Sequence, residues 1–138
     1  MQPFTFATTP RVVFGAGSLE KLPETTGPLG PCILIVTDQG MVATGLVARV
    51  TENLQKAGHA VAIYDGVIAD PPERVVLEAR DMARGCDATG VIGLGGGSSL
   101  DVAKLVALLA GSGENLADIY GVGLAKGPRL PLLLIPTT

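Results

Sequence analysis

The sequence predicts an α/β fold: a Rossmann-like parallel sheet with helices on both faces, preceded by a short N-terminal strand pair. Short apolar runs alternate with segments whose apolar residues recur at helical spacing, as in right-handed strand–helix–strand crossovers. The apolar runs do not alternate with polar residues, which is typical of strands buried on both faces. With 138 residues the chain fits one domain, and we expect residues 1–138 to form it.

The N-terminal pair consists of residues 4–6 ("FTF") and 11–15 ("RVVFG"), two short strand candidates separated by a Thr-Pro turn. Ser18 follows as the expected N-cap of a short helix that turns Leu19 and Leu22 inward. Core strands are then expected at residues 32–38, 59–65, 88–94 and 130–136.

Longer helices are expected between these strands, at residues 44–57, 70–85 and 101–110. In the second of them Asp70 stands as an acidic N-cap, Pro71 takes the first helical position and Glu73 completes the start signal. Helical spacing gives this helix a buried face of Val75, Val76, Ala79, Met82 and Ala83. The stretch 111–127 is expected to be the least regular part of the chain.

Composition and charge argue against several functional classes. Apolar residues make up 47% of the chain and charged residues 17%, the net charge is −3, and Lys and Arg are scattered, so we expect no nucleic-acid partner. No apolar run reaches the roughly 18 residues that a membrane span needs, and the N-terminus lacks a signal-peptide pattern, so we expect no membrane partner and a cytoplasmic protein. Cys32 and Cys86 are expected to be reduced thiols without a disulfide or a metal.

The stretch "VIGLGGGSSLDVAKLVALLA" at residues 91–110 is the most informative in the chain. Three glycines, Gly95, Gly96 and Gly97, separate an expected strand from an expected helix, although glycine weakens both kinds of element. A glycine-rich approach to a helix N-terminus lets a phosphate contact the free N–H groups, and Ser98 and Ser99 add hydroxyl donors. Residues 95–99 are therefore predicted to hold a pyrophosphate; the alternative is a tight strand–helix turn with a serine cap.

The spacing differs from that of the common nucleotide motifs. GxGxxG would need a third glycine where Leu100 or Ser98 stands, and a P-loop would need Gly-Lys followed by Ser or Thr. The candidate ribose-binding acid comes before the glycines: Asp38, at the end of "LIVTD". The alternative is that Asp38 is a turn residue before Gly40.

For three other polar residues, the sequence favours a structural role over a functional one. Asp101 and Lys104 are three residues apart in the expected first helical turn, where a local ion pair is the simplest interpretation. His59 is the only histidine and precedes a strand, so a structural role is expected rather than metal binding. One histidine also excludes a His-rich metal site within this chain.

"GLGGGSSLDVAK" resembles the GGGSxxDxxK motif of the iron-dependent (group III) alcohol dehydrogenases. The resemblance runs the whole length: "RVVFGAGSLEKL", "LIVTDQG", "YDGVIADPP" and "RLPLLLIPTT" occur in the order and at the spacing of the family. It implies that residues 1–138 are an amino-terminal NAD(P)-binding domain, normally followed by a helical domain that holds Fe²⁺ or Zn²⁺ through one Asp and three His. The chain is thus expected to be the cofactor half of a longer enzyme, without catalytic or metal-binding residues of its own.

The resemblance also assigns roles to residues of this chain. Gly96, Gly97, Ser98 and Ser99 would hold the pyrophosphate, with Asp101 nearby. Asp38 would bind the adenine ribose, and Thr137 and Thr138 would line the adenine side. Asp70 stands where the relatives usually have Asn, at a position that contacts the cofactor.

The implied activity is hydride transfer between a small alcohol or aldehyde and NAD, by a homodimer paired through residues 4–14. Asp38, which no arginine follows closely, favours NAD over NADP. Glycerol dehydrogenases, maleylacetate reductases and dehydroquinate synthases share the cofactor domain and remain alternatives, as does a stand-alone nucleotide-binding module without catalysis.

Overall fold

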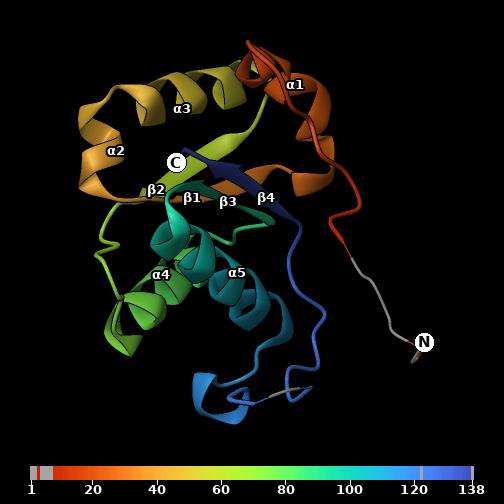
Figure 1. The fold of residues 1–138 in the computed structure, drawn as a ribbon, viewed down its shortest axis with the longest axis vertical. Helices are drawn as coiled ribbons and strands as arrows, with labels where there is room; N and C mark the ends of the chain where they lie inside the picture. Colours follow the sequence, from red (N-terminus) through yellow and green to blue (C-terminus); the bar gives the residue numbers. More distant parts are fainter. Residues whose placement is uncertain (1–2, 4–7, 122, 138) are drawn as a thin grey trace.

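The centre of the molecule is a four-stranded parallel sheet in the order β2-β1-β3-β4 (Figure 1). The computed structural model describes residue 3, residues 8–121 and residues 123–137. The strands are β1 (Cys32–Val36), β2 (Ala60–Tyr64), β3 (Gly90–Gly95) and β4 (Leu132–Pro136). They confirm the expected core strands and the parallel arrangement.

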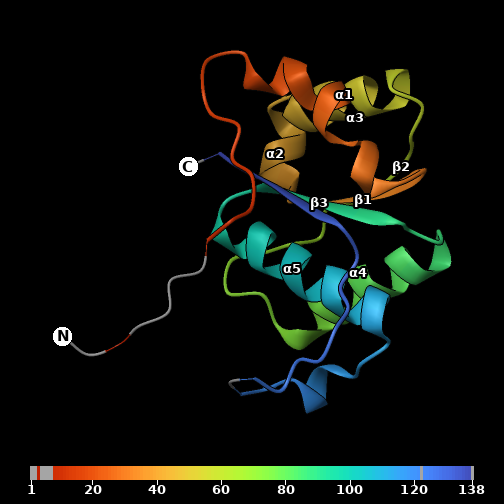
Figure 2. The same ribbon diagram turned by 90° about the vertical axis from the view of Figure 1, so that its right-hand side faces the viewer.

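Helices cover both faces of the sheet, as predicted (Figures 1 and 2). One face carries α1 (Leu22–Thr25), α2 (Gln39–Ala43) and α3 (Leu46–Lys56), and the other carries α4 (Glu73–Gly85) and α5 (Gly97–Ser112). Short 3-10 turns η1 (Ser18–Lys21), η2 (Gly27–Leu29) and η3 (Leu116–Asp118) lie in the connecting segments.

Strand β1 supplies the centre of both cores, because successive side chains of a strand point to opposite faces. Ile33 and Ile35 pack in the cluster formed with α3, whereas Leu34 and Val36 pack in the cluster formed with α4 and α5. All four side chains are fully buried. A strand apolar at every position is therefore explained by a layer of helices on each side.

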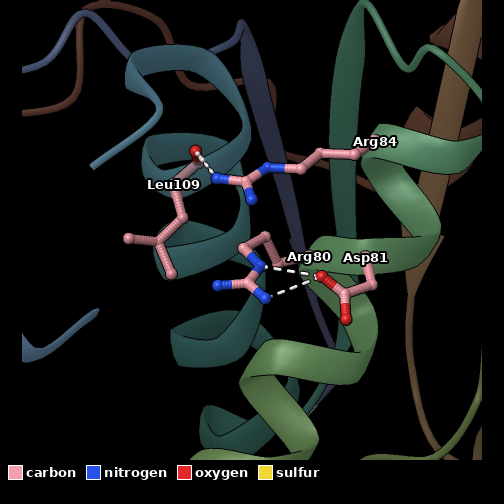
Figure 3. A network of polar contacts seen from close by, with 4 residues as sticks. All are labelled: Arg80, Asp81, Arg84 and Leu109. Atoms are coloured by element: carbon pink, nitrogen blue, oxygen red, sulfur yellow. Dashed lines mark hydrogen bonds and ion pairs between the residues drawn. The ribbon is translucent and has the colours of Figure 1, made fainter. Parts of the chain in front are cut away.

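Helices α4 and α5 are joined to each other and to the sheet by close contacts. A Cβ at Gly93 of β3 would lie 2.7 Å from Cβ of Ala103, so α5 can approach the sheet this closely only over a glycine. Arg84 near the end of α4 donates a hydrogen bond of 3.1 Å to the carbonyl of Leu109 in the last turn of α5 (Figure 3). The same carbonyl also accepts the N–H of Gly113 at 3.1 Å, and a cation at this end of a helix interacts favourably with the helix dipole.

The expected strand at residues 11–15 is wrong: residues 11–14 have no regular structure. Their side chains are largely exposed, with Val12 74% and Phe14 98% accessible. A β-branched sequence forms a strand only beside a partner strand, and the described part of the chain places none there. The other half of the expected pair, residues 4–6, lies outside the described residues.

Helix starts were predicted less well than strands. Ser18 is the first residue of η1 rather than its N-cap, which is Gly17, although Leu22 is buried as expected. α4 begins at Glu73, not directly after Asp70, because Pro72 disfavours a helical conformation at the preceding residue. Met82 is 39% exposed, since it lies at the edge of the stripe formed by the four buried residues of α4.

The histidine and the two cysteines take part in hydrogen bonds within the fold. His59 lies between two hydrogen-bonding groups, with Nδ1 2.7 Å from the carbonyl oxygen of Gly30 and Nε2 3.0 Å from Oγ1 of Thr26. Both thiols are free, and that of Cys32 donates to the carbonyl of Cys86 at 3.2 Å.

Candidate functional site

A cavity of about 590 Å³ opens at the carboxyl ends of β1 and β3. β1 continues into α2 on one face of the sheet and β3 into α5 on the other. Ligands bind in open α/β sheets at such a point, where the connections leave neighbouring strands in opposite directions. The lining residues are 38–40, 65–69 and 96–99.

One wall of the cavity is the glycine turn between β3 and α5. Gly95 has φ +139°, which side chains rarely adopt, and a Cβ there would lie 3.2 Å from Oγ of Ser99. α5 begins at Gly97, after an extended Gly96, and no side chain caps it. Within the part of the chain that the structure describes, a Cβ on Gly97 would meet no other atom within 4 Å. The helix therefore presents its first N–H groups, which have no intrahelical acceptors, at an open wall of the cavity.

Asp38 lies beside this turn and has a structural role as well. It is extended and is the N-cap of α2, an element that the sequence did not predict, with Oδ1 accepting the N–H of Met41 at 2.9 Å. Its Oδ2 accepts a hydrogen bond of 3.3 Å from Oγ of Ser99. The structure thus joins the predicted acid to the predicted glycine loop, although Asp38 and Gly95 are 57 positions apart in the sequence.

Residues 65–69 form a further wall, which sequence reasoning missed. Gly66 pairs with Asp38 through an isolated bridge, and the N–H of Val67 donates to the carbonyl of Thr37 at 3.3 Å. The available signal was the position of these residues, directly after the second core strand. Apart from Asp65, they carry no side chain that suggests chemistry.

The side chain of Tyr64 packs against this wall at Gly66. A Cβ on Gly66 would lie 2.7 Å from the hydroxyl oxygen of Tyr64, which donates at 2.8 Å to Glu78 of α4. Arg74 pairs with the other oxygen of Glu78 at 2.8 Å. Burial, followed by the hydrogen bond to Glu78, raises the pKa of Tyr64 to about 12. Hydrogen bonds from Arg74 and then Tyr64 lower the pKa of Glu78.

The remaining predicted site residues lie at or beyond the rim. Thr137 follows β4, with its N–H donating to the carbonyl of Gly95 at 3.1 Å. Asp70 lies just after the lining loop with φ 47° and is exposed. Asp101 is exposed and pairs with Lys104 at 3.3 Å, as the spacing predicted. Thr138 lies outside the described residues.

The described residues do not fit a resident metal, because no group of three or more His, Cys, Asp or Glu side chains among them could hold an ion. Within the same ranges no helix has the length and apolar character needed to cross a membrane.

The comparison with protein families gives a match over almost the whole chain. A model described as iron-containing alcohol dehydrogenase matches residues 9–138.

Individual relatives agree with this match. A protein named long-chain-alcohol dehydrogenase 1, from Geobacillus thermodenitrificans, is 39% identical over 93% of this chain and 35% of its own length. A protein named NAD-dependent methanol dehydrogenase, from Bacillus methanolicus, is 35% identical over 96% of this chain and 35% of its own length. An archaeal alcohol dehydrogenase from a Red Sea brine pool superimposes with a TM-score of 0.84 at 28% identity, covering 99% of this chain and 37% of that one.

Proposed function

The chain belongs to the iron-containing alcohol dehydrogenase family, and from this premise we propose that it is the NAD-binding part of a dehydrogenase acting on a small alcohol or aldehyde. The observation that carries the proposal is the uncapped N-terminus of α5, which opens beside Asp38 into the cavity at the switch point of the sheet. The chain spans about a third of the length of the relatives it matches. Activity, substrate and partners of the whole enzyme are therefore part of the proposal.

The cavity wall fits a pyrophosphate. No atom of the described residues occupies the space beside Gly97, and the half-buried Ser98 adds a hydroxyl to the first N–H groups of α5. The positive end of the helix dipole is the attractive charge here, because the lining residues include two carboxylates and, as far as the structure describes them, no Lys or Arg. In this proposal Gly95 allows the turn, and residues 96–98 hold the phosphates.

Asp38 supports the choice of NAD. A carboxylate at the end of β1 can accept hydrogen bonds from both hydroxyls of the adenine ribose, as acids at this position do in dinucleotide-binding folds. The relative from Bacillus methanolicus is NAD-dependent by name, which agrees with this assignment. Thr137 and Thr138 would border the adenine, with Asp70 and Asp101 at the rim.

NAD supplies the hydride chemistry when bound, and this chain contributes the orientation of the cofactor. Fe²⁺ or Zn²⁺ would be held by a second, helical domain of the enzyme, since the described residues offer no ligand set. A homodimer paired through residues 4–14 and a cytoplasmic location complete the proposal. The exposed side chains of Val12 and Phe14 support the homodimer. The free thiols of Cys32 and Cys86 support the cytoplasmic location.

Two glycine variants test this proposal. Gly97→Val places a branched side chain where a phosphate oxygen has to approach, so NAD affinity should fall at least about tenfold, or about 1.4 kcal/mol. Gly85→Val, at the other end of a helix, also adds a side chain in open space and is the matched control. Isothermal titration with NAD and thermal unfolding would be measured for both. If Gly97→Val bound NAD as well as the wild type, the phosphate assignment would be wrong.

A further inference from the structure

Ser99 differs from the three residues before it, Gly96, Gly97 and Ser98, in being buried. It is 1% exposed, whereas Ser98 beside it is half-buried and Gly97 is exposed. The sequence gives the two serines the same role, but their surroundings differ. The hydroxyl of Ser99 donates to Oδ2 of Asp38 at 3.3 Å, which directs it toward the carboxylate.

The carboxylate of Asp38 is held at both oxygens. Oδ1 accepts the N–H of Met41 at 2.9 Å, and Oδ2 accepts the hydroxyl of Ser99. Gly95 leaves room for this contact, since a Cβ there would lie 3.2 Å from Oγ of Ser99 and 3.3 Å from Oδ2 of Asp38. A carboxylate offers about four acceptor directions, so about two remain for a ligand.

We propose that Ser99 is a positioning residue that sets the preference for an unphosphorylated ribose by fixing the carboxylate of Asp38. The proposal rests on the function proposed above and assigns different roles to the two serines. Ser98 interacts with phosphate, and Ser99 acts through Asp38. With both oxygens tied, the carboxylate keeps the orientation in which it accepts from a 2′-hydroxyl and repels a 2′-phosphate. Without the hydroxyl of Ser99, only the bond to Met41 remains, and the carboxylate can rotate away from the ribose.

The test compares 5′-AMP with adenosine 2′,5′-bisphosphate, which differ only in the 2′-phosphate. Titration calorimetry would give the ratio of their dissociation constants for the 138-residue chain and its variants. Ser99→Ala should reduce the preference for 5′-AMP about tenfold, the change that about 1.4 kcal/mol produces. Ser98→Ala is the matched control: it should weaken both ligands by a similar factor and leave the ratio unchanged.

A double-mutant cycle separates positioning from general damage to the fold. Asn can replace Asp as an N-cap, so Asp38→Asn retains the start of α2 while removing the charge. In that background Ser99→Ala should no longer change the ratio, because the group through which it acts has gone. In the wild-type background, Ser99→Thr keeps a hydroxyl and should therefore retain most of the preference for 5′-AMP that Ser99→Ala loses.

The inference is overturned if Ser99→Ala leaves the ratio unchanged in the wild-type background. It is also overturned if the change is equally large with Asn at position 38, or if thermal unfolding shows that loss of structure explains it. A wild-type chain that binds neither nucleotide would instead refute the proposed function, and the inference with it. Binding without a change of ratio would refute the inference alone.

Discussion

Replacing Asp38 by asparagine should remove most of the preference for NAD over NADP without disturbing the fold. The change deletes one charge and retains an oxygen that can accept the N–H of Met41, the bond that caps α2. The wild type should prefer NAD at least about tenfold. The variant should bind the two cofactors within about threefold of each other, a difference below 1 kcal/mol.

The expected size follows from the charges at the cavity. Two unit charges about 4 Å apart repel by roughly 4 kcal/mol at an effective dielectric constant near 20, before salt and relaxation reduce the value. Asp65 lines the same cavity, and the described lining residues include no Lys or Arg to offset a 2′-phosphate. Arg49, on α3, already pairs with Glu20. About a third of the calculated repulsion is enough for a tenfold preference.

Calorimetric titration with NAD and NADP at low and at physiological salt would measure this preference. Asp87→Asn is a suitable control, because it removes the same charge at the opposite end of β3, and its φ of 51° is tolerated by asparagine. The preference should weaken with added salt in the wild type and survive in Asp87→Asn. Equal binding of both cofactors by the wild type would mean that Asp38 does not face the ribose and serves only as the N-cap of α2.

Two further outcomes are expected. The 138-residue chain should show no NAD-linked turnover of alcohols, because its described residues form no metal-binding cluster; a full-length relative is the positive control, and turnover that follows the chain through purification would contradict this. The free energy of unfolding should fall between pH 10 and about 12, by up to about 1.4 kcal/mol per pH unit, because Tyr64 keeps its proton in the folded chain and loses it in the unfolded one. Denaturant titration of Tyr64→Phe should lack this part of the decline, and an identical slope in both proteins would refute the assignment.

The strands could be predicted from the sequence because burial on both faces leaves an unmistakable pattern. Ile33, Leu34, Ile35 and Val36 are apolar without interruption, and each packs against a helix layer. That the glycine run and Asp38 lie together could be predicted for a related reason, whereas their contact with a cofactor stays a prediction. Parallel strands end at a common edge, so residues that follow two neighbouring strands meet there.

The helix starts could not be predicted equally well, because they depend on contacts that are distant in sequence. The glycines predict a loop before residue 101, but α5 begins at Gly97. Packing of the helix over Gly93 holds it against the sheet and outweighs the low helix propensity of glycine. α2 is too short for a periodic pattern, and its N-cap bond is visible only in the structure. The different surroundings of Ser98 and Ser99 could not be predicted either, because they depend on which serine faces Asp38 in the fold.

Thr37 explains why these separate segments form one site. It is fully buried, and its hydroxyl donates to the carbonyl of Leu94 at 2.7 Å, which ties the end of β1 to β3. Its N–H donates to the carbonyl of Tyr64 at 2.8 Å, and its carbonyl accepts from Val67, which ties β1 to β2 and to the loop beyond it. These bonds fix three walls of the cavity without any contribution from a ligand. A dinucleotide bound as proposed would therefore have little chain to order, which preserves affinity where the end of α5 is the attractive group among the described lining residues.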